Sequence, residues 1–275
     1  MDFSLWMFFI ALGVNGFIAY LAWNRGSVTA GGAVTGAVVG AGIMAGGGFW
    51  FWMILLFFFS SSTMFSSLAG EIKESLEKLH EKSDTRDTIQ VLANGSVGCL
   101  SAVLYGITGH EIFAVVFAAA FCGAAADTWA GEVGVSSSRP PVSILTFKPV
   151  ERGLSGGISA KGTLFAFFGS AAVGVLFFIQ RMITYGAVNQ SVVIVSLIAV
   201  TAGFLSSLID SFLGAAVQVH YIDEHTGTVS EKKQLSGRTL KQLRGVRWVN
   251  NDMVNFLSIL FASAAAALLY AVLMG

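Results

Sequence analysis

The chain has 275 residues, of which 55% are hydrophobic and only 12% are charged, and its mean hydropathy is +0.73. Soluble domains carry about 25% charged residues, so this composition excludes an ordinary soluble protein and predicts a single integral membrane domain over residues 1–275. The formal net charge is zero, and no basic stretch is interleaved with aromatic residues, so binding to nucleic acid is not expected.

Eight apolar runs are long enough to cross a bilayer as helices, which takes about 20 residues each. They cover residues 3–23, 28–46, 48–69, 90–108, 111–131, 163–184, 191–217 and 252–273. The sequence therefore predicts an all-α fold, a polytopic transmembrane bundle of about eight spans. No basic segment precedes the first run, so we expect a retained span and the plasma membrane of a bacterium or archaeon.

The basic residues predict the orientation of this bundle. With eight spans, all of the 16 Lys and Arg residues except Arg181 fall in loops on one side. Lys and Arg accumulate in cytoplasmic loops, so we expect this side to be cytoplasmic and both termini to lie outside. The lipid bilayer is then the first predicted partner.

Polar residues in or beside the spans gather at the same predicted side. Asp127 lies about 6 Å from the end of its helix, and Asp210 lies in the last third of its span. The starts of two other spans carry Asn94, Asn251, Asp252 and Asn255. Any one of these residues can merely snorkel or bond a neighbour. Several at one depth favour a functional site, because an ionisable group inside a span is costly.

A segment rich in glycine and serine, residues 153–159, follows the helix of Asp127, and we call it the glycine loop. Glycines let backbone N–H groups turn toward an anion, and cations beside them suit a polyphosphate. The loop lacks the P-loop pattern. The alternative is a flexible loop with solvated charges. The candidate phosphate ligands are Lys148, Arg152, Gly153, Ser155, Gly156, Gly157, Ser159 and Lys161.

Carboxylates that share a polar cavity either bind Mg²⁺ together with substrate phosphates or relay ions in a transporter. Asp127 and Asp210 are the predicted Mg²⁺ ligands, with Asp252 as a third candidate, and Lys148 joins the two aspartates as a predicted catalytic residue. The residues expected to orient the substrates are Arg86, Asn94, Thr128, Glu132, Asn251 and Asn255.

Five stretches carry a resemblance to one family: RDTIQVLANG at 86–95, ADTWAGEVG at 126–134, GLSGGISAKGT at 153–163, IDSFLGAAVQ at 209–218 and WVNNDMVN at 248–255. Together they resemble the integral membrane family that includes the plant chloroplast phytyl-phosphate kinase of vitamin E salvage. More distantly, Asp127 followed by KPVERG at 148–153 resembles the CTP-dependent polyprenol kinases and phosphatidate cytidylyltransferases. Here Arg152 separates Glu151 from Gly153, where that pattern has the two side by side.

The resemblance implies a membrane kinase that uses a nucleoside triphosphate, CTP by preference, to phosphorylate an isoprenoid monophosphate of the phytyl or geranylgeranyl type. The product would be the diphosphate, made at the cytoplasmic interface. A cytidylyltransferase that forms a CDP-lipid would use the same site and is the first alternative. A non-enzymatic transporter is the second. The near absence of charge in the outer halves of the last four spans counts against a transporter.

Overall fold

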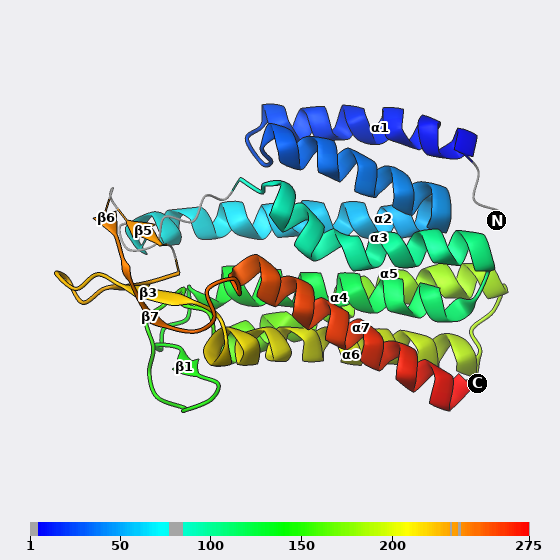
Figure 1. Ribbon diagram of the computed structural model, residues 1–275. Helices are drawn as coiled ribbons and strands as arrows, with labels where there is room; N and C mark the ends of the chain where they lie inside the picture. The colour runs from blue at the N-terminus through cyan, green and yellow to red at the C-terminus, as the bar shows by residue number, and fades with distance from the viewer. Residues whose placement is uncertain (1–4, 77–84, 232, 236–237, 275) are drawn as a thin grey trace.

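The computed structural model describes residues 5–76, 85–231, 233–235 and 238–274 of the chain. Seven helices in these ranges are long and apolar enough to cross a membrane (Figure 1). They are α1 (Leu5–Asn24), α2 (Ala30–Leu76), α3 (Thr88–Thr108), α4 (Glu111–Gly134), α5 (Ala160–Tyr185), α6 (Gln190–Ala216) and α7 (Asn251–Met274). The predicted all-α polytopic bundle is confirmed.

Helix α2 consists of two helical arms joined at Gly48. This residue has φ 76° and ψ −170°, a conformation that glycine adopts easily because it has no Cβ. The arms, residues 30–47 and 49–76, run in opposite directions (Figure 1). The chain therefore passes along the bundle eight times, close to the predicted boundaries.

Capping side chains set several helix starts, among them those of α3 and α5. The Asp87 side chain accepts a hydrogen bond from the backbone N–H of Gln90 at 2.9 Å, so α3 begins at Thr88. Ser159 Oγ accepts one from the N–H of Gly162 at 3.0 Å, so α5 begins at Ala160 instead of residue 163. A side-chain acceptor at the cap satisfies an N–H group that has no partner inside the helix.

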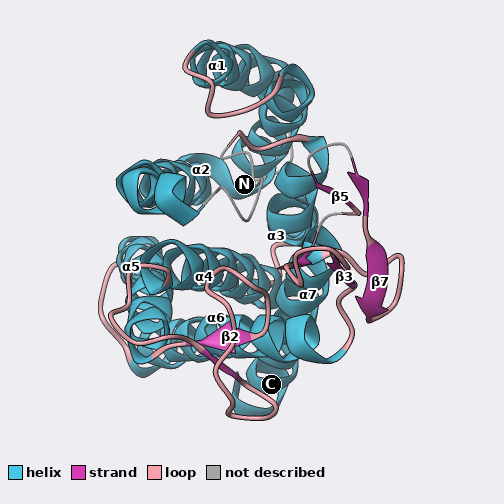
Figure 2. Ribbon diagram, turned by 90° about the vertical axis from the view of Figure 1, so that its left-hand side faces the viewer, coloured by secondary structure: helices cyan, strands magenta, loops and turns pink. Residues whose placement is uncertain are grey.

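Helix α4 lies at the centre of the packing. All of its residues from 117 to 126 are buried, and it contacts α2, α3, α5, α6 and α7. Small side chains let neighbouring helices approach closely; an added Cβ at Gly169 of α5, for example, would lie 2.7 Å from the backbone of Ala125. Helix α1, by contrast, lies at the edge of the bundle (Figure 2). Asp127 follows the buried part of α4 directly.

Small antiparallel sheets extend one end of the bundle (Figures 1 and 2). In the described ranges, β1 (Val142–Ser143) pairs with β2 (Gly157–Ile158), and β5 (Gln234–Leu235) pairs with β6 (Arg238–Thr239). A three-stranded sheet has the order β4-β3-β7, formed by β4 (Val229–Ser230), β3 (His220–Ile222) and β7 (Lys241–Arg244). These strands are not predictable from the sequence, because two to four residues are too few to show an alternating apolar pattern.

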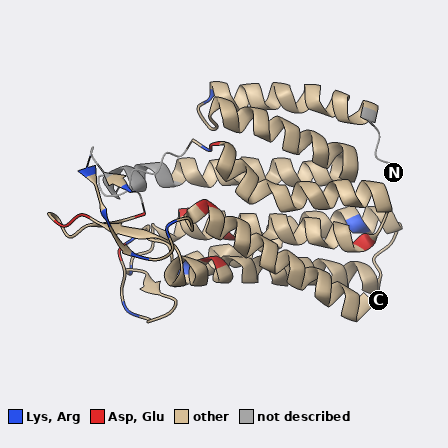
Figure 3. Ribbon diagram, in the orientation of Figure 1, with Lys and Arg blue, Asp and Glu red and all other residues tan. Residues whose placement is uncertain are grey.

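The charged residues gather at the sheet end of the bundle, while α1 begins and α7 ends at the other (Figure 3). Among the described residues, Glu111 at the start of α4 and Arg181 near the end of α5 lie at that other end. This is the separation of charge predicted from the sequence, although Lys78, Lys82 and Lys232 lie outside the described residues.

The exception is an ion pair between Arg181 of α5 and Glu111 of α4. Arg181 is fully buried, and its Nη1 lies 2.6 Å from a carboxylate oxygen of Glu111. Its guanidinium carbon also lies 5.7, 5.4 and 5.3 Å from the ring centres of Phe51, Tyr105 and Phe177. Aromatic ring faces attract cations. Together these contacts tie α2, α3, α4 and α5 at the end away from the sheets.

Candidate functional site

A cavity of about 310 Å³ lies at the sheet end of the bundle, among helices α2 to α7 and the glycine loop. Its volume falls at the lower end of the range for small-molecule sites, about 300–1,000 Å³. Most of the residues predicted from the sequence line it: Arg86, Asn94, Asp127, Thr128, Glu132, Arg152, Gly153, Ser155, Gly156, Gly157, Ser159, Asp210, Asn251 and Asn255. The fold thus brings together residues that are far apart in the chain.

Two carboxylates, Asp127 of α4 and Asp210 of α6, line this one cavity. Asp210 is 8% exposed, and its Oδ2 accepts a hydrogen bond from Ser258 Oγ of α7 at 3.3 Å. Asp127 is half-buried. Because α4 is longer than predicted, Asp127 lies about 10 Å from the helix end and not about 6 Å. Both side chains are therefore held within the bundle rather than at its rim.

The carboxylate and amide oxygens of the residues that line the cavity are of the kind that Mg²⁺ takes as ligands. Among the described residues, no group of three or more His, Cys, Asp or Glu side chains is placed to hold a metal ion unaided. Mg²⁺ usually takes only one or two carboxylates and completes its shell with water and substrate phosphates. Asn255 also lines the cavity, and its Oδ1 is buried and accepts no hydrogen bond from the described residues. An unsatisfied buried acceptor of this kind is available to a bound cation or donor.

The glycine loop packs against the end of α6. Gly156 has φ 88°, and an added Cβ there would lie 2.6 Å from atoms of Ala215. Some N–H groups of the loop already donate to protein acceptors: Leu154 N to Glu151 O at 3.4 Å, Gly157 N to Leu154 O at 3.3 Å and Ser155 N to Glu231 Oε1 at 2.7 Å. These three hydrogen bonds fix the loop. Its remaining polar groups are the ones that could contact a phosphate.

Two arginines reach the cavity from different segments. Arg86, just before α3, donates from Nη1 to Thr63 Oγ1 at 2.9 Å. Arg152 donates from Nη1 to Val135 O at 3.2 Å and from Nη2 to Ser138 O at 3.3 Å. Each guanidinium carries five donors in total. The cavity thus has two separate cationic groups, which suits two anionic ligands.

Three predicted residues do not line the cavity. Lys148 is exposed on the loop between β1 and β2. Lys161 is exposed as well, and its Nζ donates to Ser136 Oγ at 2.7 Å. Asp252 lies in the first turn of α7. The structure does not place these three side chains with Asp127 and Asp210.

Some lining residues lie outside the predicted set, among them serines of α2 and α6. Ser66 of α2 donates to Glu132 Oε1 at 3.0 Å. Ser207 and Ser211 of α6 line the cavity beside Asp210. The spacing of these three α6 residues, at i−3, i and i+1 around the aspartate, was visible in the sequence as polar positions in an apolar span. The contact with Ser66 had no comparable signal.

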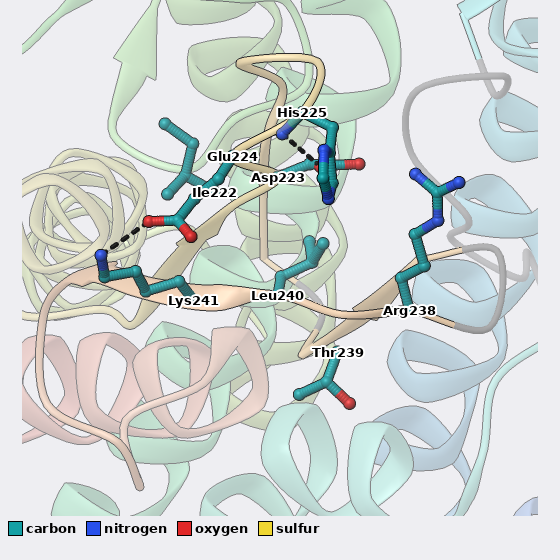
Figure 4. A pocket seen from close by; sticks show the side chains of 8 residues that line it. All are labelled: Ile222, Asp223, Glu224, His225, Arg238, Thr239, Leu240 and Lys241. Atoms are coloured by element: carbon teal, nitrogen blue, oxygen red, sulfur yellow. Dashed lines mark hydrogen bonds and ion pairs between the residues drawn. The ribbon is translucent and has the colours of Figure 1, made fainter.

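A second cavity, of about 570 Å³, lies among the sheets (Figure 4). Its charged side chains interact with neighbours: Lys241 Nζ lies 2.6 Å from Glu224 Oε1, and Asp223 Oδ1 accepts from the backbone N–H of His225 at 2.9 Å. The latter bond lowers the pKa of Asp223 below its usual value. None of the residues of the first cavity lines this one, and we assign the candidate site to the first.

Comparisons with known proteins find relatives in plants and archaea. The chain is 35% identical over 171 residues to Protein PGR of Arabidopsis thaliana, which covers 60% of the chain and 54% of the relative. It is 25% identical over 202 residues to Protein VTE6, chloroplastic, of the same plant; this match covers 72% of the chain and 51% of the relative. It is 28% identical over 166 residues to an uncharacterized membrane protein of Methanocaldococcus jannaschii, covering 60% and 65%. The chain thus spans about half the length of the two plant proteins.

No solved structure shows significant similarity to the chain. The family described as "Integral membrane protein DUF92" matches residues 13–263. That range includes every residue that lines the bundle cavity. The chain therefore belongs to this integral membrane family.

Proposed function

We propose that this protein is a membrane kinase that transfers the γ-phosphoryl group of a nucleoside triphosphate, CTP by preference, to an isoprenoid monophosphate. The observation that carries the proposal is a single cavity with two aspartates, one glutamate, two arginines and the glycine loop at one end of an apolar bundle. The family resemblance supports it, because that family includes a plant phytyl-phosphate kinase.

The position of the cavity suits an acceptor of this class. An isoprenoid monophosphate has an anionic head and an apolar tail that stays in the bilayer. The cavity lies where the apolar helices meet the charged loops. By the charge asymmetry of those loops we place this end on the cytoplasmic side of a bacterial or archaeal plasma membrane.

The reaction forms a bond between an oxygen of the acceptor phosphate and the γ-phosphorus. It breaks the bond from that phosphorus to the bridging oxygen, and the nucleoside diphosphate leaves. Phosphoryl transfer needs mainly positioning and neutralisation of charge from the protein. The acceptor phosphate is already an anion at neutral pH, so no general base is required.

The lining residues divide into roles on this proposal. Arg86 would hold the acceptor phosphate, and Arg152 with the glycine loop would hold the phosphates of the nucleotide. Asp127 and Asp210 would hold Mg²⁺, which neutralises charge on the transferred group. The remaining lining residues, Asn94, Thr128, Glu132, Asn251 and Asn255, would orient the two substrates.

The test is turnover by purified protein in detergent with CTP, Mg²⁺ and geranylgeranyl monophosphate. Mass spectrometry should find the prenyl diphosphate and CDP in equal amounts. Asp127→Asn should abolish both products while the protein still folds. Glu224→Gln, which changes an exposed carboxylate that does not line the bundle cavity, should leave turnover intact.

Two results would contradict the proposal. Pyrophosphate released together with a CDP-lipid would show a cytidylyltransferase that uses the same cavity. No turnover with a broad panel of nucleotides and lipid acceptors, together with ion-dependent uptake into liposomes, would show a transporter.

A further inference from the structure

Glu231 lies in the turn after β4, outside the helix bundle, and it contacts the glycine loop. Its Oε1 accepts a hydrogen bond from the backbone N–H of Ser155 at 2.7 Å. Hydrogen bonds to a carboxylate are about twice as strong as those between neutral groups. Ser155 lines the cavity, whereas Glu231 is not among the described residues that do. The carboxylate therefore holds the loop from outside and takes no space from a ligand.

The same part of the glycine loop is held from two further directions. Ser155 Oγ donates to Asn251 Oδ1 at the start of α7, at 3.3 Å. Gly156 packs against Ala215 at the end of α6, with no room for a Cβ. Both helices carry other lining residues of the cavity. The contacts thus set the position of the loop relative to those residues.

The sheet that carries Glu231 is fixed to the same two helix ends. Three hydrogen bonds of 2.9 Å fix it: Val219 N–H donates to Val249 O, Val246 N–H donates to Val217 O, and Arg244 Nη1 donates to Ala215 O. Two of these bonds join segments that directly follow α6 to the segment between β7 and α7. The third ties β7 to the last turn of α6. The sheet therefore presents the Glu231 carboxylate from a frame built on α6 and α7.

We propose that Glu231 is a positioning residue for the phosphate donor. By holding the N–H of Ser155, it fixes residues 155 and 156 so that the other groups of the loop face the nucleotide phosphates. This inference rests on the proposed function. A carboxylate that faced the phosphates would repel them, but on the outer side of the loop its charge is directed at an N–H group instead.

The kinetic test compares Glu231→Ala with Glu231→Gln, which keeps an acceptor oxygen, and with Glu224→Ala as a control in the neighbouring turn. Loss of a charge-assisted bond should raise the KM for CTP about 10-fold or more in Glu231→Ala. We expect kcat and the KM for the lipid acceptor to change less than about 3-fold, because the loop binds only the donor. Glu231→Gln should restore most of the CTP affinity, and Glu224→Ala should match the wild type. A fall in kcat with an unchanged KM for CTP, or equal effects of the two Glu231 variants, would overturn the inference.

A second measurement needs no turnover. Hydrogen–deuterium exchange of the ligand-free protein should show faster exchange of amides 153–157 in Glu231→Ala than in the wild type or Glu231→Gln. Unchanged exchange in Glu231→Ala would overturn the positioning role, whether or not the protein is a kinase. Faster exchange in a protein whose wild type turns over no nucleotide would support the contact but refute the proposed function.

Discussion

Gly156 of the glycine loop packs against Ala215 at the end of α6 so closely that a Cβ added to Gly156 would lie 2.6 Å from atoms of that alanine. The loop is therefore part of the packed structure of the bundle end. The alternative considered from the sequence, a loose loop with solvated charges, does not describe it. The geometry of this contact makes the loop sensitive to a single methyl group.

We first predict that Gly156→Ala impairs both stability and nucleotide binding. The new Cβ meets backbone, and φ 88° is unfavourable for alanine, so the variant should lose about 1–3 kcal/mol of stability. Gly186→Ala is the matched control, because Gly186 has φ 72° but open space around it. The midpoint temperature of thermal unfolding should fall in both variants, and only Gly156→Ala should raise the KM for CTP. An equal KM in the two variants would count against a binding role for the loop.

Asp210→Asn should weaken divalent cation binding. The amide lacks the charge of the carboxylate, so the Mg²⁺ concentration for half-maximal turnover should rise about 10-fold or more. Binding of Mn²⁺, followed by electron paramagnetic resonance, should weaken in parallel. Ser258→Ala removes the hydrogen bonds of Ser258 Oγ to Asp210 Oδ2 and to Asn255 O but keeps the Asp210 carboxylate, so it should have a smaller effect. Unaltered Mn²⁺ binding in Asp210→Asn would exclude this residue as a ligand.

The ion pair of Glu111 and Arg181 should contribute to stability without contributing to turnover. Arg181 is fully buried, so Glu111→Gln leaves a buried charge without its counter-ion and should cost about 3–5 kcal/mol. Combining Glu111→Gln with Arg181→Met should recover most of that loss. Unfolding of each variant in detergent measures the loss of stability and its recovery in the double variant. The kcat of the folded fraction should not change, since the pair lies at the end away from the cavity, and a lower kcat would show coupling between the two ends.

Lys148 provides a test of a sequence-based assignment. Its side chain is exposed and does not line the cavity, so Lys148→Ala should lower kcat/KM by less than about 3-fold. Arg152→Ala, which removes a lining cation, should cost about 10-fold or more. A loss in Lys148→Ala as large as that in Asp127→Asn would show that the loop between β1 and β2 folds over the cavity when the substrates bind.

Stability should fall as the pH is lowered below about 6.5, through His220. Burial lowers the pKa of this histidine from its ordinary value of 6.5 and outweighs the hydrogen bond to Gln218 O, which raises the pKa. Of the nearby charges, Arg244 lowers the pKa and Glu231 raises it. The unfolded chain then takes up the proton first, so stability is complete above pH 6.5 and is lost as the pH falls toward the folded pKa. The slope from this group is at most about 1.4 kcal/mol per pH unit. Thermal unfolding between pH 8 and 5 should show a weaker pH dependence in His220→Gln, and an unchanged dependence would refute the assignment.

The transmembrane part of the fold was predictable because the bilayer imposes a length and a composition on every span. Even the break at Gly48 appeared as the boundary between two apolar runs. The grouping of Asp127 with Asp210 was also predicted, because both lie near the same end of spans that run in the same direction, and the cavity contains both. Only the cap at Ser159 shifted a helix start by a full turn.

The extramembrane contacts were not predictable, because they depend on tertiary structure that leaves no periodic pattern. Lys148 and Arg152 lie in the same connection between β1 and β2, yet only Arg152 lines the cavity, whereas Lys148 is exposed. Glu231 lies in a polar segment far from the glycine loop in sequence and reaches Ser155 only through the fold of the three-stranded sheet. Charge and spacing could not distinguish either residue from its solvated neighbours.

The cavity lies at the sheet end of the bundle and not midway along it, so the two proposed substrates need not approach it by the same route. A water-soluble nucleotide and a lipid-anchored phosphate would reach the same site by separate routes, one from the aqueous phase and one from the adjoining leaflet. Neither would have to pass through the hydrocarbon layer. The prenyl chain would enter and leave through one leaflet, so the proposed reaction would change the head group of a lipid without moving that lipid across the membrane.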